Sequence, residues 1–387
     1  MNPPKSILDQ IIESRNIQEA SLFNPSEIIS ELLKELSPKE REVVSRRFGL
    51  DGTPIQTLEE IGKNFQITRE RIRQIQSAAV RKIRTLAQAK EKLDILQHTV
   101  TRLLHEYGGI IEGSQLYDEL LSHLGNGSQH QQSTGFVLSQ LLTDHVDRVR
   151  SSDHLYPGWK LRLLDVEFVH QVLEVFARII EEQQRVFRLE ELISSFKQHD
   201  FFKENRQRFL PVGAVAVDDE EEALDRILRS YLTISRRIEQ NLLGEWGLAH
   251  WATVRPRRMG DKIYLILKQG GKPLHFTEIT NQINQAKFDH KVAYPATIHN
   301  ELILDERYVL VGRGIYALKE WGYQPGTVSD VVAQVLTDAQ RPLTRDEVVS
   351  EVGKRRLVRK STIYLALTNK DRFIKVGDRY QLKAGKA

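Results

Sequence analysis

The chain has 387 residues, of which 40% are hydrophobic and 28% charged, with a net charge of +4 and no cysteine. This usage is typical of globular proteins and excludes wholesale disorder. At about 100 to 200 residues per domain, the length predicts several domains. Without cysteine there is no disulfide and no thiolate zinc site.

Sequence patterns exclude two further classes. No apolar stretch approaches the ~20 residues needed to cross a bilayer, and the opening MNPPKSILDQ lacks the apolar run of a signal peptide. The 12 histidines show no metal-ligand spacing. We therefore expect a cytoplasmic protein with no membrane contact, no metal and no other cofactor.

Positive charge is expected to concentrate in one segment. Residues 36–90 hold 12 Lys and Arg against 6 Asp and Glu, whereas the rest of the chain holds 44 against 46. A local excess of this kind suits a polyanion, because neutralised phosphates release their counterions. A basic, solvated helix face is the alternative.

The first 100 residues carry clear helix signals. Isoleucines and leucines at helical spacing in SEIISELLKEL predict a packing helix before residue 37. The tetrapeptide SPKE at 37–40 combines a capping box with a proline at the first helical position, and this helix should end near Gly49. Thr57 and Glu60 repeat the capping box, and Thr68 is the expected cap of a further helix.

The two helices around the connector at 65–67 predict a helix-turn-helix between residues 57 and 84. Ile61, Gly62 and Ile72 occupy the positions that need apolar packing and a close helix crossing. The second helix is amphipathic, with Ser77 on its polar face. Its apolar face consists of Ile72, Ile75, Ala79 and Ile83. A plain amphipathic helical hairpin is the alternative.

The polar face has the chemistry of a major-groove reader. Arginine pairs with guanine, glutamate accepts from the cytosine amino group, and glutamine pairs with adenine. The candidate base-reading residues are Arg69, Glu70, Arg73 and Gln74. Arg69 and Glu70 could together read one G·C pair. The candidate phosphate contacts are Thr57, Thr68, Arg71, Arg81, Lys82 and Arg84, with a solvated helix end as the alternative.

Beyond residue 95 the chain carries a weak internal repeat. Four segments enter a helix in the same way: GGIIEGSQLYDEL, QRVFRLEELISSF, GKPLHFTEITNQI and QRPLTRDEVVSEV. Three repeats finish in a β-prone hairpin, and the second is less regular. Three helices followed by a hairpin is the order of a winged helix. The acidic run at 218–222 is expected in a loop or at a helix start.

These signals predict a mainly α protein, in which an N-terminal helix-turn-helix domain precedes tandem winged-helix modules with small β-hairpins. The expected domains are 1–35 (a helical segment), 36–92 (the helix-turn-helix), and the four modules 93–165, 166–256, 257–324 and 325–387.

The last module contains a dense basic run before a predicted helix. Its cations are Lys354, Arg355, Arg356, Arg359 and Lys360. Phosphate binding is chemically natural at a helix N-terminus, so the run is a candidate second DNA contact. A flexible solvated loop is the alternative.

One segment resembles a known family. LSPKEREVVSRRFGLDG followed by TLEEIGKNFQITRERIRQIQSAAVRKIR is similar to region 4 of bacterial primary sigma factors, over about 50 residues. In that family this helix reads the minus-35 promoter element, which implies base or backbone roles for Arg69, Glu70, Arg73 and Gln74. The resemblance also implies a bacterial, nucleoid-associated protein.

Family members dock region 4 on the β flap of RNA polymerase through an apolar surface. Val43, Val44, Phe48 and Leu50 are the candidates for that surface, with core packing as the alternative. A lysine that activators touch in the family corresponds to Ala78, so recruitment through that position is not expected. Only 35 residues precede the segment, so we expect an incomplete sigma factor that does not open promoters unaided.

A second resemblance covers about 259–322, which looks like a HARE-HTH domain, a winged-helix family. PATIHNELI would be its third helix, with Thr297, His299 and Asn300 facing a partner or, for the histidine, packing inside. The wing would lie around Gly312-Arg313-Gly314.

The leading hypothesis is a sequence-specific DNA-binding transcription regulator that reads a minus-35-like element in double-stranded DNA and contacts RNA polymerase. No phosphate loop, nucleophile elbow or paired-carboxylate motif is present, so no enzyme is expected. The rival hypothesis is a polymerase-associated or other protein-interaction scaffold. A component of a mobile-element or defence system is a third.

Overall fold

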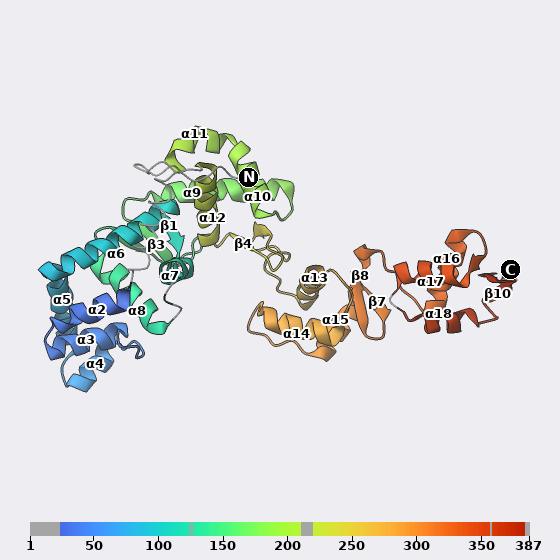
Figure 1. Cartoon of the computed structure of the whole chain (residues 1–387), viewed down its shortest axis with the longest axis horizontal. Helices are drawn as coiled ribbons and strands as arrows, with labels where there is room; N and C mark the ends of the chain where they lie inside the picture. Colours follow the sequence, from blue (N-terminus) through green and yellow to red (C-terminus); the bar gives the residue numbers. More distant parts are fainter. Residues whose placement is uncertain (1–23, 123, 125–126, 210–219, 357, 384–387) are drawn as a thin grey trace, which may run out of the picture. The chain divides into compact units, whose positions relative to one another are not determined.

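The computed structural model describes residues 24–122, 124, 127–209, 220–356 and 358–383 (Figure 1). It is mainly helical with small antiparallel sheets, as the sequence predicted. Residues 1–23 of the expected helical segment 1–35 lie outside the described residues. The chain divides into two compact units, Met1–Glu239 and Gln240–Ala387, which are described separately.

From residue 24, where the described residues begin, the first unit shows five successive helices. They are α2 (Pro25–Lys34), α3 (Pro38–Phe48), α4 (Leu58–Phe65), α5 (Arg69–Thr85) and α6 (Ala87–Glu106). The predicted caps are confirmed: Ser37 and Thr57 each form a full capping box, and Thr68 caps α5. The left-handed Gly49 ends α3, as expected.

The first repeat folds as a winged helix. Its elements are β1 (Ile110–Glu112), α7 (Gly113–Leu121), α8 (Ser128–Phe136), the π-helical turn η1 (Val137–Leu141), β2 (Val146–Val149) and β3 (Gly158–Leu161). The sheet order is β1-β3-β2, with antiparallel pairing of Ile111 with Trp159 and Val146 with Leu161.

The second repeat is more helical than expected and packs on the first. It contains α9 (Val166–Gln183), α10 (Leu189–Gln198), α11 (Asp200–Phe209) and α12 (Glu220–Ile234), with strands β4 (Ile238–Gln240) and β5 (Trp246–Leu248) where the two units divide. Ser230 on α12 donates to the carbonyl of Ile110 at 2.6 Å, and the Tyr231 hydroxyl donates to the carbonyl of Gly108 at 2.9 Å. The acidic residues from Glu220 start α12, whereas residues 218 and 219 lie outside the described residues.

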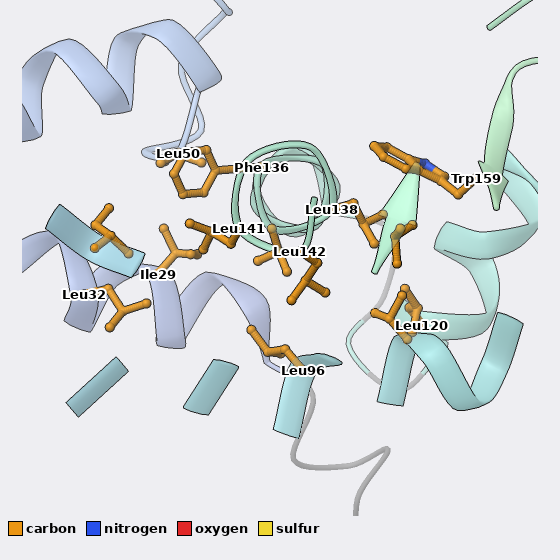
Figure 2. Close-up of a cluster of buried hydrophobic side chains, with 14 of the residues drawn as sticks. Ile29, Leu32, Leu50, Leu96, Leu120, Phe136, Leu138, Leu141, Leu142 and Trp159 are labelled. Atoms are coloured by element: carbon orange, nitrogen blue, oxygen red, sulfur yellow. The ribbon is translucent and has the colours of Figure 1, made fainter. Parts of the chain in front are cut away.

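One hydrophobic core joins the helix-turn-helix to the first winged module. Figure 2 shows Phe136, Leu138, Leu141 and Leu142 around the axis of one helical segment, between side chains of residues 29–50 and others of residues 96–159. The expected boundary at 92/93 falls inside α6, and the helix before residue 35 belongs to this core. The physical reason is that α2 and α5 bury their apolar faces against the module.

The second unit contains two winged modules with separate cores. The first consists of α13 (Met259–Gly270), β6 (Leu274–His275), α14 (Phe276–Ala286), α15 (Pro295–Leu304), β7 (Tyr308–Gly312), β8 (Ile315–Leu318) and the 3-10 turn η2 (Lys319–Trp321). The second consists of α16 (Val328–Ala339), β9 (Leu343–Thr344), α17 (Arg345–Arg355), α18 (Lys360–Leu367), β10 (Phe373–Val376) and β11 (Arg379–Leu382). Their sheets have the same strand order, β6-β8-β7 in one module and β9-β11-β10 in the other.

No helix in the described ranges is long and apolar enough to cross a membrane. Within the same ranges, no group of three or more His, Asp or Glu side chains is arranged to hold a metal ion.

Replacing the buried Phe136, which is 1% exposed, tests the shared core. Phe136→Ala should lower the free energy of unfolding of the first unit by about 3 to 5 kcal/mol, because it removes contacts and leaves a cavity. Urea denaturation followed by circular dichroism measures this. Gln131→Ala, exposed on the same helix, is the control and should change little. A loss below about 1 kcal/mol for Phe136→Ala would contradict the shared core.

Candidate nucleic-acid interface

The turn between α4 and α5 fixes how the two helices cross. Gln66 takes the left-handed conformation that ends α4, with φ at 56°. A β-carbon on Gly62 would lie 2.8 Å from the carbonyl oxygen of Ile67, so only glycine permits this close approach. Val43, Ile61 and Ile72 are each 0% exposed and form the small core beneath the turn. The expected packing roles of Ile61, Gly62 and Ile72 are therefore confirmed.

The structure brings the four predicted base-reading residues to one open face of α5. Arg69, Glu70, Arg73 and Gln74 are all exposed. The opposite face packs inward, with Ile72, Ala79, Val80 and Ile83 buried and Ile75 half-buried. The helix is therefore amphipathic as predicted, and its polar side is unobstructed by the rest of the first unit.

Within this face, the Glu70 carboxylate forms an ion pair with Arg73. The Arg73 Nε donates to Glu70 Oε2 at 2.8 Å, and its Nη2 donates to Oε1 at 2.7 Å. This hydrogen bonding lowers the pKa of the Glu70 carboxyl and raises the pKa of Arg73. Arg71 donates from Nη1 to the Gln74 Oε1 at 3.1 Å. The polar face is thus a preorganised network, which the sequence reasoning missed although the i,i+3 spacing of Glu70 and Arg73 could have indicated it.

The predicted phosphate contacts fall into three groups. The hydroxyls of Thr57 and Thr68 act as helix caps, each accepting a backbone N–H three residues on, at 3.2 Å. Arg71, Arg81 and Lys82 are exposed. Arg84 is engaged elsewhere: its Nε donates to the Gln140 carbonyl at 2.7 Å, and its Nη2 donates to the Thr143 hydroxyl at 2.5 Å. The structure gives Arg84 an internal role in place of the expected phosphate contact.

Most of the expected flap-docking surface is buried. Val43 and Val44 are 0% exposed and Leu50 is 5% exposed. Phe48 packs its ring 4.8 Å from the ring of Phe136. Burial leaves Val43, Val44 and Leu50 no surface for docking, whereas Phe48 is half-buried against the core. Core packing, the alternative interpretation, is confirmed.

Only part of the basic run in the last module is available. Lys354 pairs with Glu351 at 2.7 Å and Arg355 pairs with Asp338 at 2.5 Å. Arg356 is 8% exposed and donates to the Gly326 carbonyl, and burial lowers its pKa. Arg359 and Lys360 are exposed at the start of α18. Arg355 and Arg356 are therefore held inside the module, whereas Lys354, Arg359 and Lys360 face solvent, Lys354 in an exposed pair with Glu351.

Charge distribution adds a signal that the sequence analysis missed. Residues 325–387 hold 13 Lys and Arg against 7 Asp and Glu, the same excess as residues 36–90. The expectation that the excess lies in one segment was wrong, because an acidic middle section hides this second basic module. Lys375 and Arg379 on the β10–β11 hairpin are exposed and extend the candidate surface.

Helix α15, the third helix of the 257–324 module, lacks the basic residues found at the start of α18. Thr297 and Asn300 on α15 are exposed, whereas the His299 ring packs between those of Phe276, at 5.0 Å, and Tyr316, at 5.9 Å. Helix α15 contains no lysine or arginine. In the wing, Arg313 is exposed and Gly314 has a φ of 69°.

Comparison with known proteins bears on the N-terminal part. Residues 32–85 match the family described as Sigma-70, region 4. RNA polymerase sigma factor SigA of Clostridium acetobutylicum is 47% identical over 70 residues, which is 18% of this chain and 18% of that protein. RNA polymerase sigma factor RpoD of Neisseria gonorrhoeae is 50% identical over 79 residues, 20% of this chain and 12% of that protein. SigA of Nostoc sp. is 53% identical over 58 residues, 15% of each chain.

The capped helix pair with its exposed polar helix defines a helix-turn-helix domain of the DNA-binding class. More particularly, residues 32–85 form a sigma-70 region 4 domain, which confirms the resemblance stated for this segment. The chain spans less than a fifth of the length of these relatives. The HARE-HTH resemblance of 259–322 stays a prediction.

The Glu70–Arg73 pair predicts a titration shift. Because its folded pKa is lowered, Glu70 stabilises the fold above its ordinary value of 4.5, and that contribution is lost as the pH falls through the lowered value. Arg73→Ala should return the Glu70 pKa toward 4.5, as measured by carboxyl-carbon NMR, whereas Arg69→Ala should change it little. A Glu70 pKa at or above 4.5 in the unaltered protein would contradict the pair.

The last module predicts a change in salt dependence. The double variant Arg359→Ala with Lys360→Ala should reduce the slope of log affinity against log salt by about 1 to 2, because each neutralised phosphate contributes roughly 0.9. Filter binding of the full chain to duplex DNA measures the slope. Arg355→Ala, whose guanidinium is only 23% exposed and pairs with Asp338 at 2.5 Å, should change it less. An unchanged slope in the double variant would remove this module from the DNA interface.

Proposed function

We propose that this protein is a sequence-specific DNA-binding transcription regulator that reads a minus-35-like promoter element through α5. The observation that carries the proposal is the exposed face of Arg69, Glu70, Arg73 and Gln74 on the second helix of a sigma-70 region 4 domain. We further propose that it is not an enzyme, since its sequence lacks the catalytic motifs considered above.

Recognition starts from the preorganised pair. Arg73 binds Glu70 through one edge of its guanidinium, which leaves Nη1 and the outer N–H of Nη2 to donate to a base or phosphate. Arg69 lies at the first turn and is available for a bidentate bond to guanine O6 and N7. Each bidentate base contact supplies roughly 1 to 3 kcal/mol of discrimination. The Glu70–Arg73 pair is exposed, so exchanging it for a DNA contact has little cost.

Most of the affinity is proposed to come from phosphates. Arg71, Arg81 and Lys82 are exposed along α5, and the N-terminus of α5 adds its dipole. Three such contacts predict a slope of about −3 in log affinity against log salt. Association with the nucleoid would follow from this binding.

RNA polymerase is proposed as a second partner besides DNA, because the relatives that match residues 32–85 are named RNA polymerase sigma factors. The buried state of Leu50 and its neighbours speaks against binding of the β flap in the way first expected. Activity at promoters is therefore proposed to depend on DNA recognition first.

A direct test compares a duplex carrying TTGACA with a scrambled duplex at fixed salt, using the full chain. Arg69→Ala and Glu70→Ala should each reduce the preference for TTGACA by roughly 5- to 150-fold, which corresponds to about 1 to 3 kcal/mol. Arg81→Ala, an exposed cation further along α5, is the control and should weaken both duplexes alike. Equal affinity of the unaltered chain for the two duplexes would rule out sequence-specific recognition of TTGACA.

The second candidate function is a protein-interaction scaffold. A specific observation favours it: α15 carries no cation and exposes Ile303 by 61% and Leu304 by 79%. Apolar side chains of this kind suit a protein partner better than phosphates. Weak and equal binding of the two duplexes in the test above would favour this function.

A further inference from the structure

The third helix of the first winged module lies against the region 4 domain. Phe136, Val137 and Leu138, at the end of α8 and the start of η1, are at most 1% exposed in the core that also contains Ile29 and Leu50 (Figure 2). The ring of Phe136 meets that of Phe48 at 4.8 Å. The helix that reads DNA in many winged helices is here a packing element.

Polar contacts fix the position of this helix. Ser26 on α2 and the His130 Nδ1 on α8 are 2.8 Å apart, and Gln129 donates to the Leu50 carbonyl at 3.2 Å. At the other end, Arg84 of α5 donates to the Gln140 carbonyl in η1. The contacts therefore come from α2, from the loop after α3 and from α5. Separation would expose the buried side chains and break all of these bonds.

The composition of α8 agrees with a packing role. Its sequence, SQHQQSTGF, contains no lysine or arginine. A helix that enters the major groove runs between two rows of phosphates, which favours cations on its flanks. Helix α5 carries Arg69, Arg71 and Arg73 in its first five residues and stays exposed while α8 is in place.

We propose that the first winged module is a built-in protein partner that permanently covers the apolar side of the region 4 domain. This side consists of Val44, Phe48, Leu50 and the buried face of α5. The domain then presents α5 to DNA without a second protein on that side. Resting on the function proposed above, this means that the chain occupies minus-35-like DNA as a competitor of a sigma-bearing polymerase and does not recruit the polymerase through this apolar side.

The absence of cysteine from the sequence allows a direct test in the full chain. Ser26→Cys and His130→Cys are introduced together, and the two thiols are joined by mild oxidation or a short bis-alkylating reagent. The single variants are matched controls that cannot form the intramolecular bond. Near-complete linkage is expected with at least one of the two reagents, because the Ser26 hydroxyl and the His130 Nδ1 are 2.8 Å apart and the bis-alkylating reagent spans the length that cysteine lacks relative to histidine. Failure to link with both reagents would overturn the closed arrangement.

The linked and unlinked proteins are then compared in two assays. Affinity for the TTGACA duplex should agree within about twofold, and both should reduce run-off transcription by purified sigma-bearing polymerase from a minus-35 promoter to the same extent. Polymerase bound by the unlinked protein and released on linkage would overturn the proposal, because it would show that α8 moves aside. Loss of duplex preference in every form, with linkage intact, would reject the proposed function while the closure stands.

Discussion

The ring of Phe136 lies between elements that the sequence separates widely. It packs on Phe48 from one side and belongs to the same core as Leu96, Leu120 and Trp159 on the other (Figure 2). Because one continuous core holds both the helix-turn-helix and the first winged module, the position of α5 is set by residues far beyond the region 4 domain. The polar face of α5 is exposed because its apolar face packs into the core and so orients the helix.

Members of the resembling family combine DNA reading with docking on a protein, and in this chain the shared core affects the two properties differently. The polar face of α5 is preserved and open, with the Glu70–Arg73 pair holding one of its arginines in place. Most of the apolar residues expected to dock a partner, namely Val43, Val44 and Leu50, are covered by the chain itself. A region 4 domain can thus keep the chemistry for DNA while its protein-binding side takes an internal partner.

The winged modules do not share one role. The third helix of the first module packs one face into a core, that of the third module exposes Ile303 and Leu304, and that of the last module begins with Arg359 and Lys360. Three helices in equivalent positions thus present packing, apolar and basic surfaces. The fold supplies a common frame, and the residues on each third helix determine which partner chemistry suits it.

Short-range features were predictable from the sequence. The capping boxes at Ser37 and Thr57, the cap at Thr68, the amphipathic α5 and the close approach at Gly62 all depend on residues a few positions apart, and each is confirmed. The winged-helix order followed from local helix and hairpin signals, although the extra helix of the second repeat and its packing through Ser230 did not.

What only the tertiary structure decided concerns partners distant in sequence. An apolar Leu50 is equally consistent with a docking surface and a core, and an arginine such as Arg84 is equally consistent with a phosphate and a carbonyl 56 residues away. Composition and periodicity determine that such side chains need an apolar or a polar partner. They do not determine which part of the chain supplies it, because burial and long-range hydrogen bonds arise only when the helices pack.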